Sequence, residues 1–592
     1  MHASLSHPPH LVGFTITNEP PPTVAIQEVK ELLAKSNQEL LEAHAEILRL
    51  KEKAGCLQQL IDSYRAILSP FRNLPQDILR EIFYHCLPIH RNSIMSATDA
   101  PVVLTRVCSL WRSIALATPR IWAKIHIPIP GHPASSFRYP SFLQGSALAR
   151  RQQIFSKLMQ LRCQVVKEWL GRSGSCPLSI SLSYPTHYVP SNLLEHDVDD
   201  GLTDPLIQIL LSFASRWSDI HFWIPPFLYG KIESRLSNSM LPILQNFTAK
   251  VHSRTGQPGG TINIIQAPNL QKLSLDGSLL TGSNPTILPS IANQLTHLAF
   301  HSPISDHDFF NIIKFCRSLI DCQVKLQAPW PRSHMFPSPL LQPDMEQVDL
   351  PNLEVLKLCD MGGLSFVFRT IKTPSLKELY YKSMLRYSGE DHNSSSILPA
   401  EPLFAVLQNT GAPFRKLTIE PSTFRREDTL MGLHMANRVS HLVIRDSHYL
   451  KNSNGWNMEE DILLHGLEDF DIDSLRVVNN STPTPETPYT QIILPSLDNL
   501  EVYGVQKLTD EGIIGVLRSR IDASRRGEVS PLRRVKFQFW RQKENDFREE
   551  ILQYAESAGI AMELELEYPP EALIPYIGRL SPSFLVPVFG AQ

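Results

Sequence analysis

Two sequence motifs that would indicate catalysis, a phosphate-binding glycine loop and a serine-hydrolase elbow, are incomplete or absent in this chain. Gly256, Gly259 and Gly260 would need a following Lys and Ser or Thr to cradle a nucleotide phosphate, and neither follows. The Gly-x-Ser-x-Gly elbow of a serine hydrolase is absent from the sequence. We therefore interpret the glycine cluster as a turn, and we expect no catalytic residue and no cofactor.

The metal-binding side chains also lack a binding pattern. No two cysteines form a Cys-x-x-Cys pair, and the zinc motif His-Glu-x-x-His does not occur. We expect no metal site, and the simplest interpretation of such scattered cysteines is reduced intracellular thiols. Acidic residues at 459–461 favour a helix N-terminus through its dipole. Basic residues between 525 and 536 either contact an acidic ligand or form a solvated face.

Length and composition limit the class of protein. At 592 residues the chain exceeds what one hydrophobic core supports, so we expect several folded units or a repeat array. Its 42% hydrophobic and 19% charged residues are typical of soluble globular proteins. A net charge of -3 argues against a nucleic-acid partner. With no membrane span and no signal segment expected, the sequence predicts a cytoplasmic or nuclear protein, or one present in both.

A long heptad repeat is the first element expected in the chain. Its apolar residues recur at alternating steps of three and four, and Ser36 is the polar exception, which predicts a coiled-coil helix. Glu46 falls at g and Lys51 at e, which favours a parallel homodimer. The alternative is one long helix folded onto its own downstream domain. The seam positions are Ile26, Val29, Leu33, Ser36, Leu40, Ala43, Ile47, Leu50, Ala54, Leu57, Ile61, Tyr64 and Leu68.

Short helices are predicted next. Residues 73–76 combine a capping Asn, a Gln three positions later and Pro75 in the first turn, which together start a helix. An apolar stripe follows as far as Pro88, and a second one runs from Leu104 to Ile114. Short helices of this kind make only a thin core, so their exposed apolar residues indicate an interface.

These residues resemble the F-box. Leu74-Pro75, then Val107-Cys108-x-x-Trp111, then an Ile-Trp pair occur in the family's order. The preceding heptads are similar to those of F-box proteins common in mushroom-forming fungi, and the resemblance covers residues 25–127. The connection at 89–100 is longer than in a typical F-box, which leaves the relative placement of the first two helices open.

The resemblance implies a binding role. An F-box binds the Skp adaptor of a Skp-cullin-F-box ubiquitin ligase, while a separate conjugating enzyme brings ubiquitin and the rest of the chain holds a target protein. The chain would then be a receptor and no enzyme. The residues assigned to the adaptor-binding face and its supporting core are Leu74, Pro75, Ile78, Leu79, Ile82, Phe83, Leu104, Val107, Cys108, Trp111, Ile114 and Trp122.

Beyond this region the sequence alternates helix and strand. Residues 147–170 predict a helix, and Leu178, Ile180 and Leu182 alternate as a strand. A tract beginning Pro268-Asn269-Leu270, with further apolar residues three and five positions after Leu270, recurs at 351–358, 374–381 and 495–502. Variants of the tract begin at Leu295, Leu319, Phe414, Val439, Leu467 and Leu532.

The tracts are similar to the leucine-rich repeats often attached to F-boxes. The 25 residues from Leu270 to Leu295 suit one strand and one helix per repeat. The Asn expected three residues after the third apolar position is replaced, so the ladder of side-chain amides between repeats is missing and the curvature is open. The replacing residues are Ser278, Met361, Met384, Ser422, Ser447, Leu475 and Val505.

We therefore expect a mixed α/β fold with a coiled-coil helix, a three-helix F-box and an irregular leucine-rich-repeat-like solenoid. The function expected is the substrate-recognition subunit of the ligase, with an unknown protein target. The alternatives are a coiled-coil and leucine-rich-repeat scaffold without ligase association, or an enzyme hidden in residues 140–592. The expected boundaries are a disordered N-terminus at 1–23, coiled coil at 24–69, F-box at 70–127, linker at 128–146, repeats at 147–567 and a tail at 568–592.

Overall fold

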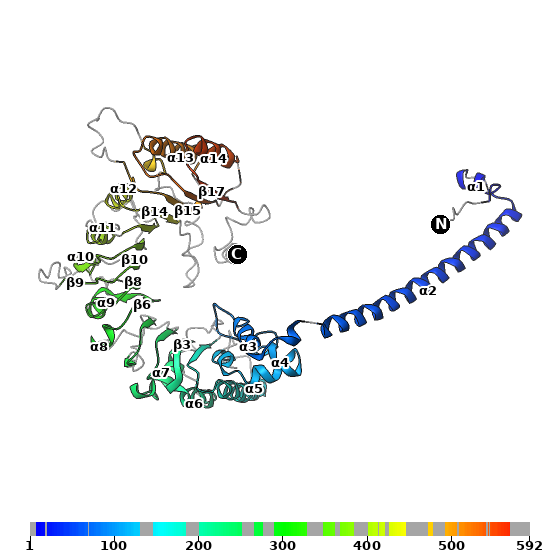
Figure 1. Cartoon of the computed structure of the whole chain (residues 1–592), viewed down its shortest axis with the longest axis horizontal. Helices are drawn as coiled ribbons and strands as arrows, with labels where there is room; N and C mark the ends of the chain where they lie inside the picture. Colours follow the sequence, from blue (N-terminus) through cyan, green and yellow to red (C-terminus); the bar gives the residue numbers. More distant parts are fainter. Residues whose placement is uncertain are drawn as a thin grey trace. The chain divides into compact units, whose positions relative to one another are not determined.

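The computed structural model forms two compact units, Met1–Ile82 and Phe83–Gln592 (Figure 1). The boundary between them lies inside helix α3 (Gln76–His85). The structure describes residues 8–17, 20–68, 70–130, 146–184, 201–251, 266–275, 289–327, 347–360, 367–383, 401–411, 414–420, 426–445, 472–477, 492–505, 508–539, 541, 543 and 545–568.

The first unit consists mainly of one long helix, α2 (Thr23–Ile67). Side-chain pairs four residues apart support it: Gln38 Nε2 donates to the Glu42 carboxylate at 2.9 Å. The helix expected within residues 24–69 is confirmed, and its pairing with a second helix stays a prediction. A short 3-10 helix, η1 (Pro70–Asn73), leads into α3.

The segment before α2 differs from expectation. Residues 1–23 were expected to lack regular structure, yet α1 (Val12–Ile16) is helical. The physical reason is local: Leu11 is buried, and the His10 ring lies 3.0 Å from the Glu28 carboxylate of α2. One apolar anchor and one polar contact thus order a short helix that has no heptad signal.

The second unit begins with the end of α3 and a set of short helical segments. These are η2 (Val103–Arg106), α4 (Ser109–Leu116) and η3 (Pro119–Trp122). The Cys108 sulfur accepts from the Trp111 N–H at 3.4 Å and caps α4, while the Thr118 hydroxyl donates to the Ile114 carbonyl at 2.6 Å at its other end. The helix expected after Pro75 is confirmed as α3. The helix expected from Leu104 to Ile114 is divided into η2 and α4, because the backbone at Cys108 is extended.

Trp122 fastens these segments to the remainder of the second unit. Its side chain is fully buried, and its indole Nε1 donates to the Ala115 carbonyl of α4 at 2.8 Å. Its ring meets the edge of the Trp169 ring, with centroids 4.9 Å apart. Trp169 belongs to α5 (Ser146–Arg172), so one side chain joins α4 to the helix that precedes the repeats.

A long parallel sheet forms the body of the second unit. Within the described residues, each strand pairs in parallel with its neighbour in chain order, apart from β7 (Ile304–Ser305), which pairs with β8, and a small separate sheet of β9 (Val348–Asp349) and β11 (Ile371–Lys372). The strands in order are β1 (Lys124–Pro128), β2 (Leu178–Ser183), β3 (Trp217–Ile224), β4 (Asn246–Val251), β5 (Lys272–Leu275), β6 (His297–Phe300), β8 (Asp321–Gln327), β10 (Val355–Asp360), β12 (Glu378–Ser383), β13 (Lys416–Ile419), β14 (His441–Arg445), β15 (Asn499–Val505), β16 (Arg534–Phe539) and β17 (Glu563–Glu567).

The recurring tracts coincide with these strands. The strand starts two residues after the first apolar position, as β5 does after Leu270, and the three apolar residues of that tract are all buried. The same offset holds for every tract in the described residues, while the tract at Leu467 lies outside them. The helix expected at 147–170 and the strand at Leu178 are also confirmed.

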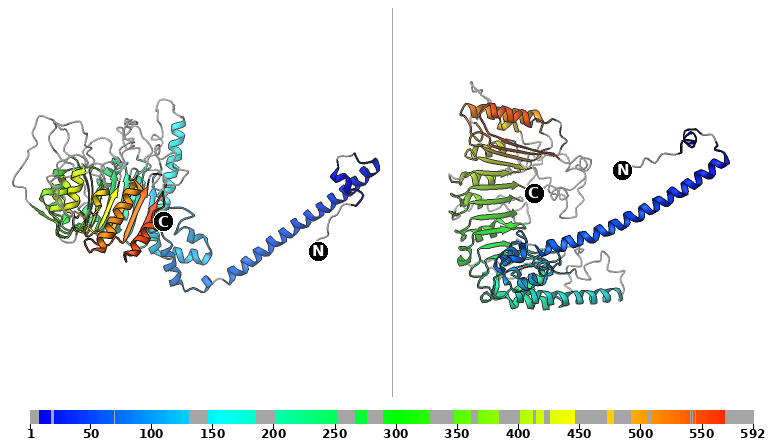
Figure 2. Two further views of the ribbon diagram at one scale, coloured as in Figure 1. Left: turned by 90° about the horizontal axis from the view of Figure 1, so that it is seen from above. Right: turned by 45° about the vertical axis from the view of Figure 1, so that its right-hand side comes forward.

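Helices line the outer side of the curved sheet (Figures 1 and 2). A helix between two strands returns the chain so that the strands run parallel. The helices are α6 (Asp204–Ser212), α7 (Pro226–Glu233), α8 (Pro289–Ala292), α9 (Asp306–Ile313), α10 (Val367–Thr370), α11 (Glu401–Gln408), α12 (Arg426–Met435), α13 (Asp510–Arg525) and α14 (Arg548–Ser557).

Backbone carbonyls connect consecutive repeats where the sequence lacks the Asn ladder. The Gln271 carbonyl accepts from the N–H groups of Thr296 and His297 at 2.8 and 3.1 Å, which ties one turn to the next. Of the positions expected to replace the ladder Asn, Leu475 and Val505 are described and the other five lie outside the described residues. The carbonyls that accept two consecutive N–H groups belong to Gln245, Gln271, Thr296, Ile320, Glu354, Lys377, Arg415, Ser440 and Asp498.

The expected boundary between the F-box and the linker changes. The F-box was expected to end at 127 and a linker to follow, but β1 (Lys124–Pro128) is the first strand of the sheet and pairs with β2. The alternation of Ile125 and Ile127 with polar neighbours is the signal that sequence reasoning missed. Residues 131–145 of the expected linker and most of the expected tail, from 569 on, lie outside the described residues.

A buried carboxyl pair lies beneath the sheet. Asp306, in the first turn of α9, and Asp360, at the end of β10, are both buried. Burial, together with the smaller effect of the neighbouring Asp360 carboxylate, raises the pKa of Asp306 to about 7. The Oδ1 atom of Asp306 has no hydrogen-bond partner in the structure.

Replacing Trp122 with Ala should destabilise the second unit by about 3–5 kcal/mol, because the change leaves a large cavity and removes the indole bond to Ala115. Trp111→Ala should cost less, since Trp111 is only partly buried. Urea unfolding followed by circular dichroism measures both. Equal costs for the two variants would contradict the anchoring role of Trp122.

Asp306→Asn should stabilise the protein more at high pH than at low pH. Between the unfolded pKa near 3.8 and the folded value of about 7, the folded state binds the extra proton, so stability falls as pH rises. From pH 5 to pH 8 the wild type should lose about 2–3 kcal/mol relative to the variant. Urea unfolding at both pH values checks this, and a variant-to-wild-type difference that does not change with pH would contradict it.

Candidate protein-binding surfaces

The residues assigned to the adaptor-binding face separate into a buried set and an exposed set. Leu79, Phe83, Leu104, Ile114 and Trp122 are buried. Leu74, Ile82 and Trp111 are partly buried, while Pro75, Ile78, Val107 and Cys108 are exposed. The helical pattern alone treats all of these positions as one stripe. The structure divides them into a supporting core and side chains available to a partner.

One group of exposed apolar side chains in the second unit lies on α4 and in the two-residue segment between η2 and α4. Val107 is 56% exposed and Leu110 is 44% exposed. Leu116, at the end of α4, is also exposed. Neither Leu110 nor Leu116 was among the assigned residues, because spacing alone does not tell which side of a short helix is covered. Three apolar side chains left exposed within ten residues indicate an interaction surface.

Aromatic contacts hold the end of α3 against α4 and η3. The rings of Phe83 and Trp111 have centroids 4.9 Å apart at an interplanar angle of 54°. The guanidinium of Arg120, in η3, lies 3.5 Å from the centroid of the Tyr84 ring. These contacts fix the side from which Val107 and Leu110 are exposed, so the surface is rigid before a partner binds.

The long connection at 89–100 has a structural role. Its Ser93 carbonyl accepts from the His126 N–H at 2.7 Å, and Ile94 forms a parallel bridge with His126, so it covers the free edge of β1. Asn92 exchanges hydrogen bonds with Ser179 and Ser181 of β2. Arg91 and Asp99 close the connection with an ion pair at 3.1 Å. The extra length thus attaches the short helices to the sheet.

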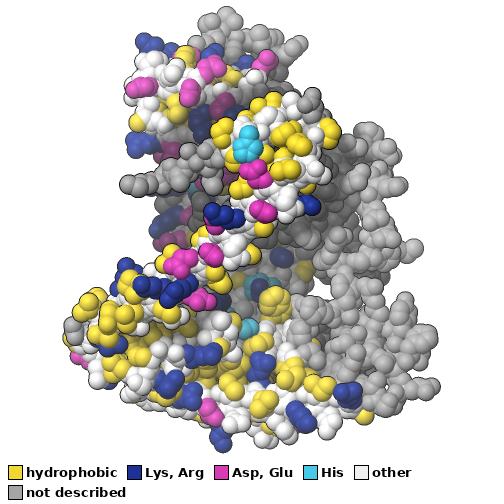
Figure 3. Space-filling view, turned by 90° about the vertical axis from the view of Figure 1, so that its right-hand side faces the viewer, with side chains coloured by type: hydrophobic (Ala, Val, Ile, Leu, Met, Phe, Trp, Pro, Cys, Tyr) yellow, Lys and Arg dark blue, Asp and Glu magenta, His cyan; other side chains and the backbone are white. Residues whose placement is uncertain are grey.

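A second apolar stripe lies on α5. Ile154, Leu158, Leu161 and Val165 are exposed and follow one another at steps of four, three and four residues. The opposite side of the same helix, which includes Trp169, is buried. Exposed hydrophobic side chains lie among Lys and Arg side chains along the lower part of Figure 3. The sequence pattern at 147–170 predicted a helix, but it did not show that one side of the helix is buried and the other exposed.

The strand residues that alternate with the buried ones form a polar surface opposite the helices, here called the inner face. Ion pairs connect neighbouring strands across it. Lys416 of β13 lies 3.4 Å from Glu378 of β12, and Lys536 of β16 lies 2.7 Å from Glu567 of β17. Such pairs between exposed groups contribute little stability each, about 0–1 kcal/mol. They fix the positions of charges across the surface.

Two tyrosine–carboxylate groups organise the later strands of the inner face. His441 Nε2 lies 2.9 Å from Glu501, and the Tyr503 hydroxyl donates to Glu501 at 2.7 Å. The hydrogen bond from His441 is the main cause that lowers the pKa of Glu501 to about 2. The Tyr380 hydroxyl donates to Glu420, whose carboxylate also pairs with Lys382 at 2.7 Å.

An exposed tryptophan occupies the earlier part of the inner face. Trp223 of β3 is 48% exposed and follows His221 on the same side of the strand. The Lys250 ammonium of β4 lies 5.8 Å from the centroid of its ring. A large aromatic side chain on a polar strand surface is typical of a protein-binding hot spot. Sequence reasoning missed it, because its exposure depends on the register of a strand that was not predicted.

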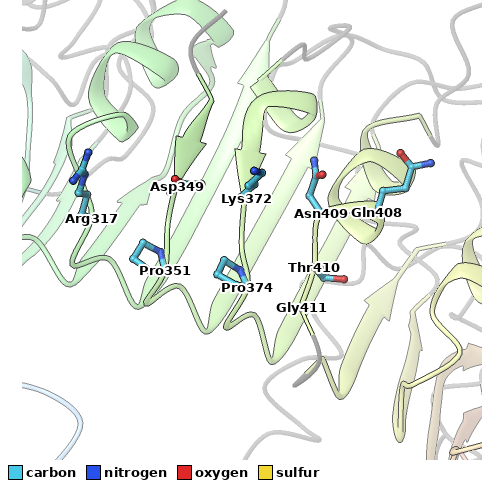
Figure 4. Close-up of a pocket in the computed structure, with 9 residues that line it drawn as sticks. All are labelled: Arg317, Asp349, Pro351, Lys372, Pro374, Gln408, Asn409, Thr410 and Gly411. Carbon is cyan, nitrogen blue, oxygen red and sulfur yellow. The ribbon is translucent and has the colours of Figure 1, made fainter.

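A shallow cavity of about 640 Å³ follows the turns that precede consecutive strands (Figure 4). Its lining combines Pro351, Pro374 and Gly411 with the charged side chains of Arg317, Lys372 and Asp349. The turns approach each other closely here: a Cβ atom added at Gly411 would overlap the Pro374 carbonyl. The cavity therefore results from tight stacking of the repeats, and its side chains include no nucleophile paired with a base.

The described part of the chain was also searched for metal-binding groups and for membrane-spanning helices. There, no group of three or more His, Cys, Asp or Glu side chains is arranged to hold a metal ion. The helices described also include none that is both long enough and apolar enough to cross a membrane.

The chain was compared with protein-family models and with curated proteins. No protein-family model matches the chain. No curated protein matches it either.

Proposed function

We propose that this chain is the substrate-recognition subunit of a Skp-cullin-F-box ubiquitin ligase. In this proposal the region at 74–122 is an F-box that binds the Skp adaptor. The sheet and its helices form a leucine-rich-repeat-like solenoid that binds a target protein. The observation that carries the proposal is the exposure of Pro75, Ile78 and Val107, which stand at F-box motif positions, while other motif positions such as Leu79 and Leu104 are buried.

The energetics favour a partner for the exposed side chains. Burying a Val or Leu side chain completely contributes about 1.5–3 kcal/mol, so the half-exposed Val107 and Leu110 each have about half of that left to gain. A few such side chains, on helices held rigid by Phe83 and Trp122, suffice for a specific interface because little ordering is needed on binding.

The chain contributes binding and proximity in this proposal, and the chemistry belongs to a separate conjugating enzyme. A target held on the solenoid is kept near the ubiquitin-carrying enzyme, which raises its effective concentration. No cofactor or metal is needed for this role. A cytoplasmic or nuclear location suits it, because the thiols of this chain are free cysteines.

The inner face is the surface that we assign to the target. Its fixed charges, among them Glu501 and Lys536, would select a partner of complementary charge pattern. Trp223 would supply the apolar anchor. The alternative function, an interaction scaffold without ligase association, would use the same face, so the adaptor is the partner that distinguishes the two.

Val107→Glu or Leu110→Glu should lower binding of the Skp adaptor at least about tenfold, because each change places a carboxylate in an apolar interface. Met431→Glu is the matched control, since Met431 is similarly exposed on α12. A pull-down of purified adaptor with each full-length variant measures the effect. The wild type failing to bind the adaptor would leave the scaffold as the function, and unaltered binding by both Glu variants would refute the assigned surface.

Trp223→Ala should lower target binding at least about tenfold while adaptor binding stays at the wild-type level. Phe315→Ala is the control, because Phe315 is exposed beyond α9 with Lys314 5.1 Å from its ring centroid, much as Lys250 approaches Trp223. Quantitative mass spectrometry of proteins co-purified from the native host compares the two. If both variants retain the same proteins as the wild type, the target does not bind at Trp223.

A further inference from the structure

We propose that α2 pairs with α2 of a second copy of this chain in a parallel, in-register coiled coil. The basis is independent of the ligase proposal: it rests on side-chain exposure, charge placement and residue types within α2. We assign a second copy of the chain as the partner, because the exposed apolar seam of α2 has the same length and the same heptad pattern as the seam of another α2.

The apolar seam of α2 is exposed along its whole length. Its large side chains range from 38% exposure at Ile26 to 81% at Leu68. The 45 residues of α2 span about 67 Å, far longer than the three to four turns of an average globular helix. A stripe with the 3.5-residue period over that distance is covered most simply by a partner helix with the same period. The exposed large side chains of the seam are Ile26, Val29, Leu33, Leu40, Ile47, Leu50, Leu57, Ile61, Tyr64 and Leu68.

Charges beside the seam determine the orientation. In a parallel pair, position g faces position e five residues later on the partner helix. Glu46 then faces Lys51, and Glu39 faces His44. Both contacts join an acid with a base, and no contact of this kind joins two like charges.

An antiparallel pair with full overlap places e opposite e. Lys30 would then face Arg65, and His44 would face Lys51. In the same register the g positions bring Glu46 opposite Lys53, an attractive contact. This antiparallel pair sets Lys30 against Arg65 and keeps one acid–base contact where the parallel pair has two, so the sequence of α2 favours the parallel arrangement.

Residue types in the second half of the seam favour two strands. Ile47 and Ile61 occupy a, and Leu50 and Leu57 occupy d. β-branched residues at a with Leu at d are typical of parallel dimers rather than trimers or tetramers. The resulting assembly would carry two copies of the Phe83–Gln592 unit, so a target with two binding sites would gain from avidity.

Neighbouring residues of α2 provide a matched test. Leu40 and Ile47 lie at a, whereas Leu41 and Leu48 lie at b, outside a two-stranded seam, and all are exposed. In sedimentation equilibrium at micromolar concentration, the full-length wild type and the Leu41→Lys/Leu48→Lys variant should be dimers. The Leu40→Lys/Ile47→Lys variant should be a monomer. A monomeric wild type, or equal dissociation by both double variants, would overturn the proposal.

Disulfide formation tests the orientation. In a Cys56→Ser background, Ala54→Cys places a thiol at a, and Gly55→Cys places one at b on the outer side. A disulfide needs close, aligned Cα atoms, and identical a positions meet only in a parallel, in-register pair. Mild oxidation should therefore give a covalent dimer from Ala54→Cys and none beyond the background from Gly55→Cys. A dimer that fails to cross-link through Ala54→Cys would rule out this register.

Discussion

The structure of the second unit depends on one constraint: a parallel strand of this chain buries its apolar side chains only when the next strand stacks beside it. Leu270, Leu273 and Leu275 are fully buried because β4 and β6 flank β5. The shared carbonyls, such as that of Gln271, set the spacing of the stack by satisfying two N–H groups of the following turn. This backbone arrangement needs no particular side chain, which explains how the repeats persist without the Asn ladder.

A stack of parallel strands also has two edge strands. An uncovered edge strand offers unpaired backbone N–H and C=O groups with which another chain can pair. The two ends of this sheet solve the problem differently. At β1 the connection containing Ser93 covers the edge, and Trp122 packs the short helices onto α5. Among the described residues β17 is the last strand, and its exposed side chains Glu563 and Glu565 are charged and pair with Arg534 and Lys536 of β16; charged side chains on an edge strand oppose pairing with a further strand. The short helices are therefore part of the sheet's architecture, and a partner bound to Val107 would sit on a rigid support.

Sequence reasoning succeeded where one physical requirement dominates. The apolar triplets had to be strands because they are buried on one side, and residues 24–69 had to be helical because of their period. It failed where burial depends on neighbours distant in sequence. Ile78 and Leu79 are adjacent and equally apolar, yet one is exposed and the other buried. The α5 stripe and Trp223 were missed for the same reason, and β1 was missed although Ile125 and Ile127 alternate with less buried neighbours, because the strand directly follows the F-box-like segment.

The inner face differs from the apolar surfaces in how it can bind. Its charges are already paired between strands, as in Lys416 with Glu378, so a partner gains little from one more ion pair and must keep the existing ones satisfied. Affinity then has to come from apolar contact, and charge placement acts mainly by excluding mismatched partners. Trp223 is an exposed aromatic side chain on this face, and the pairs around Glu501 occupy its other end. The physical expectation is a target with an apolar contact near β3 and a charge pattern that leaves the pairs of β12 to β17 intact.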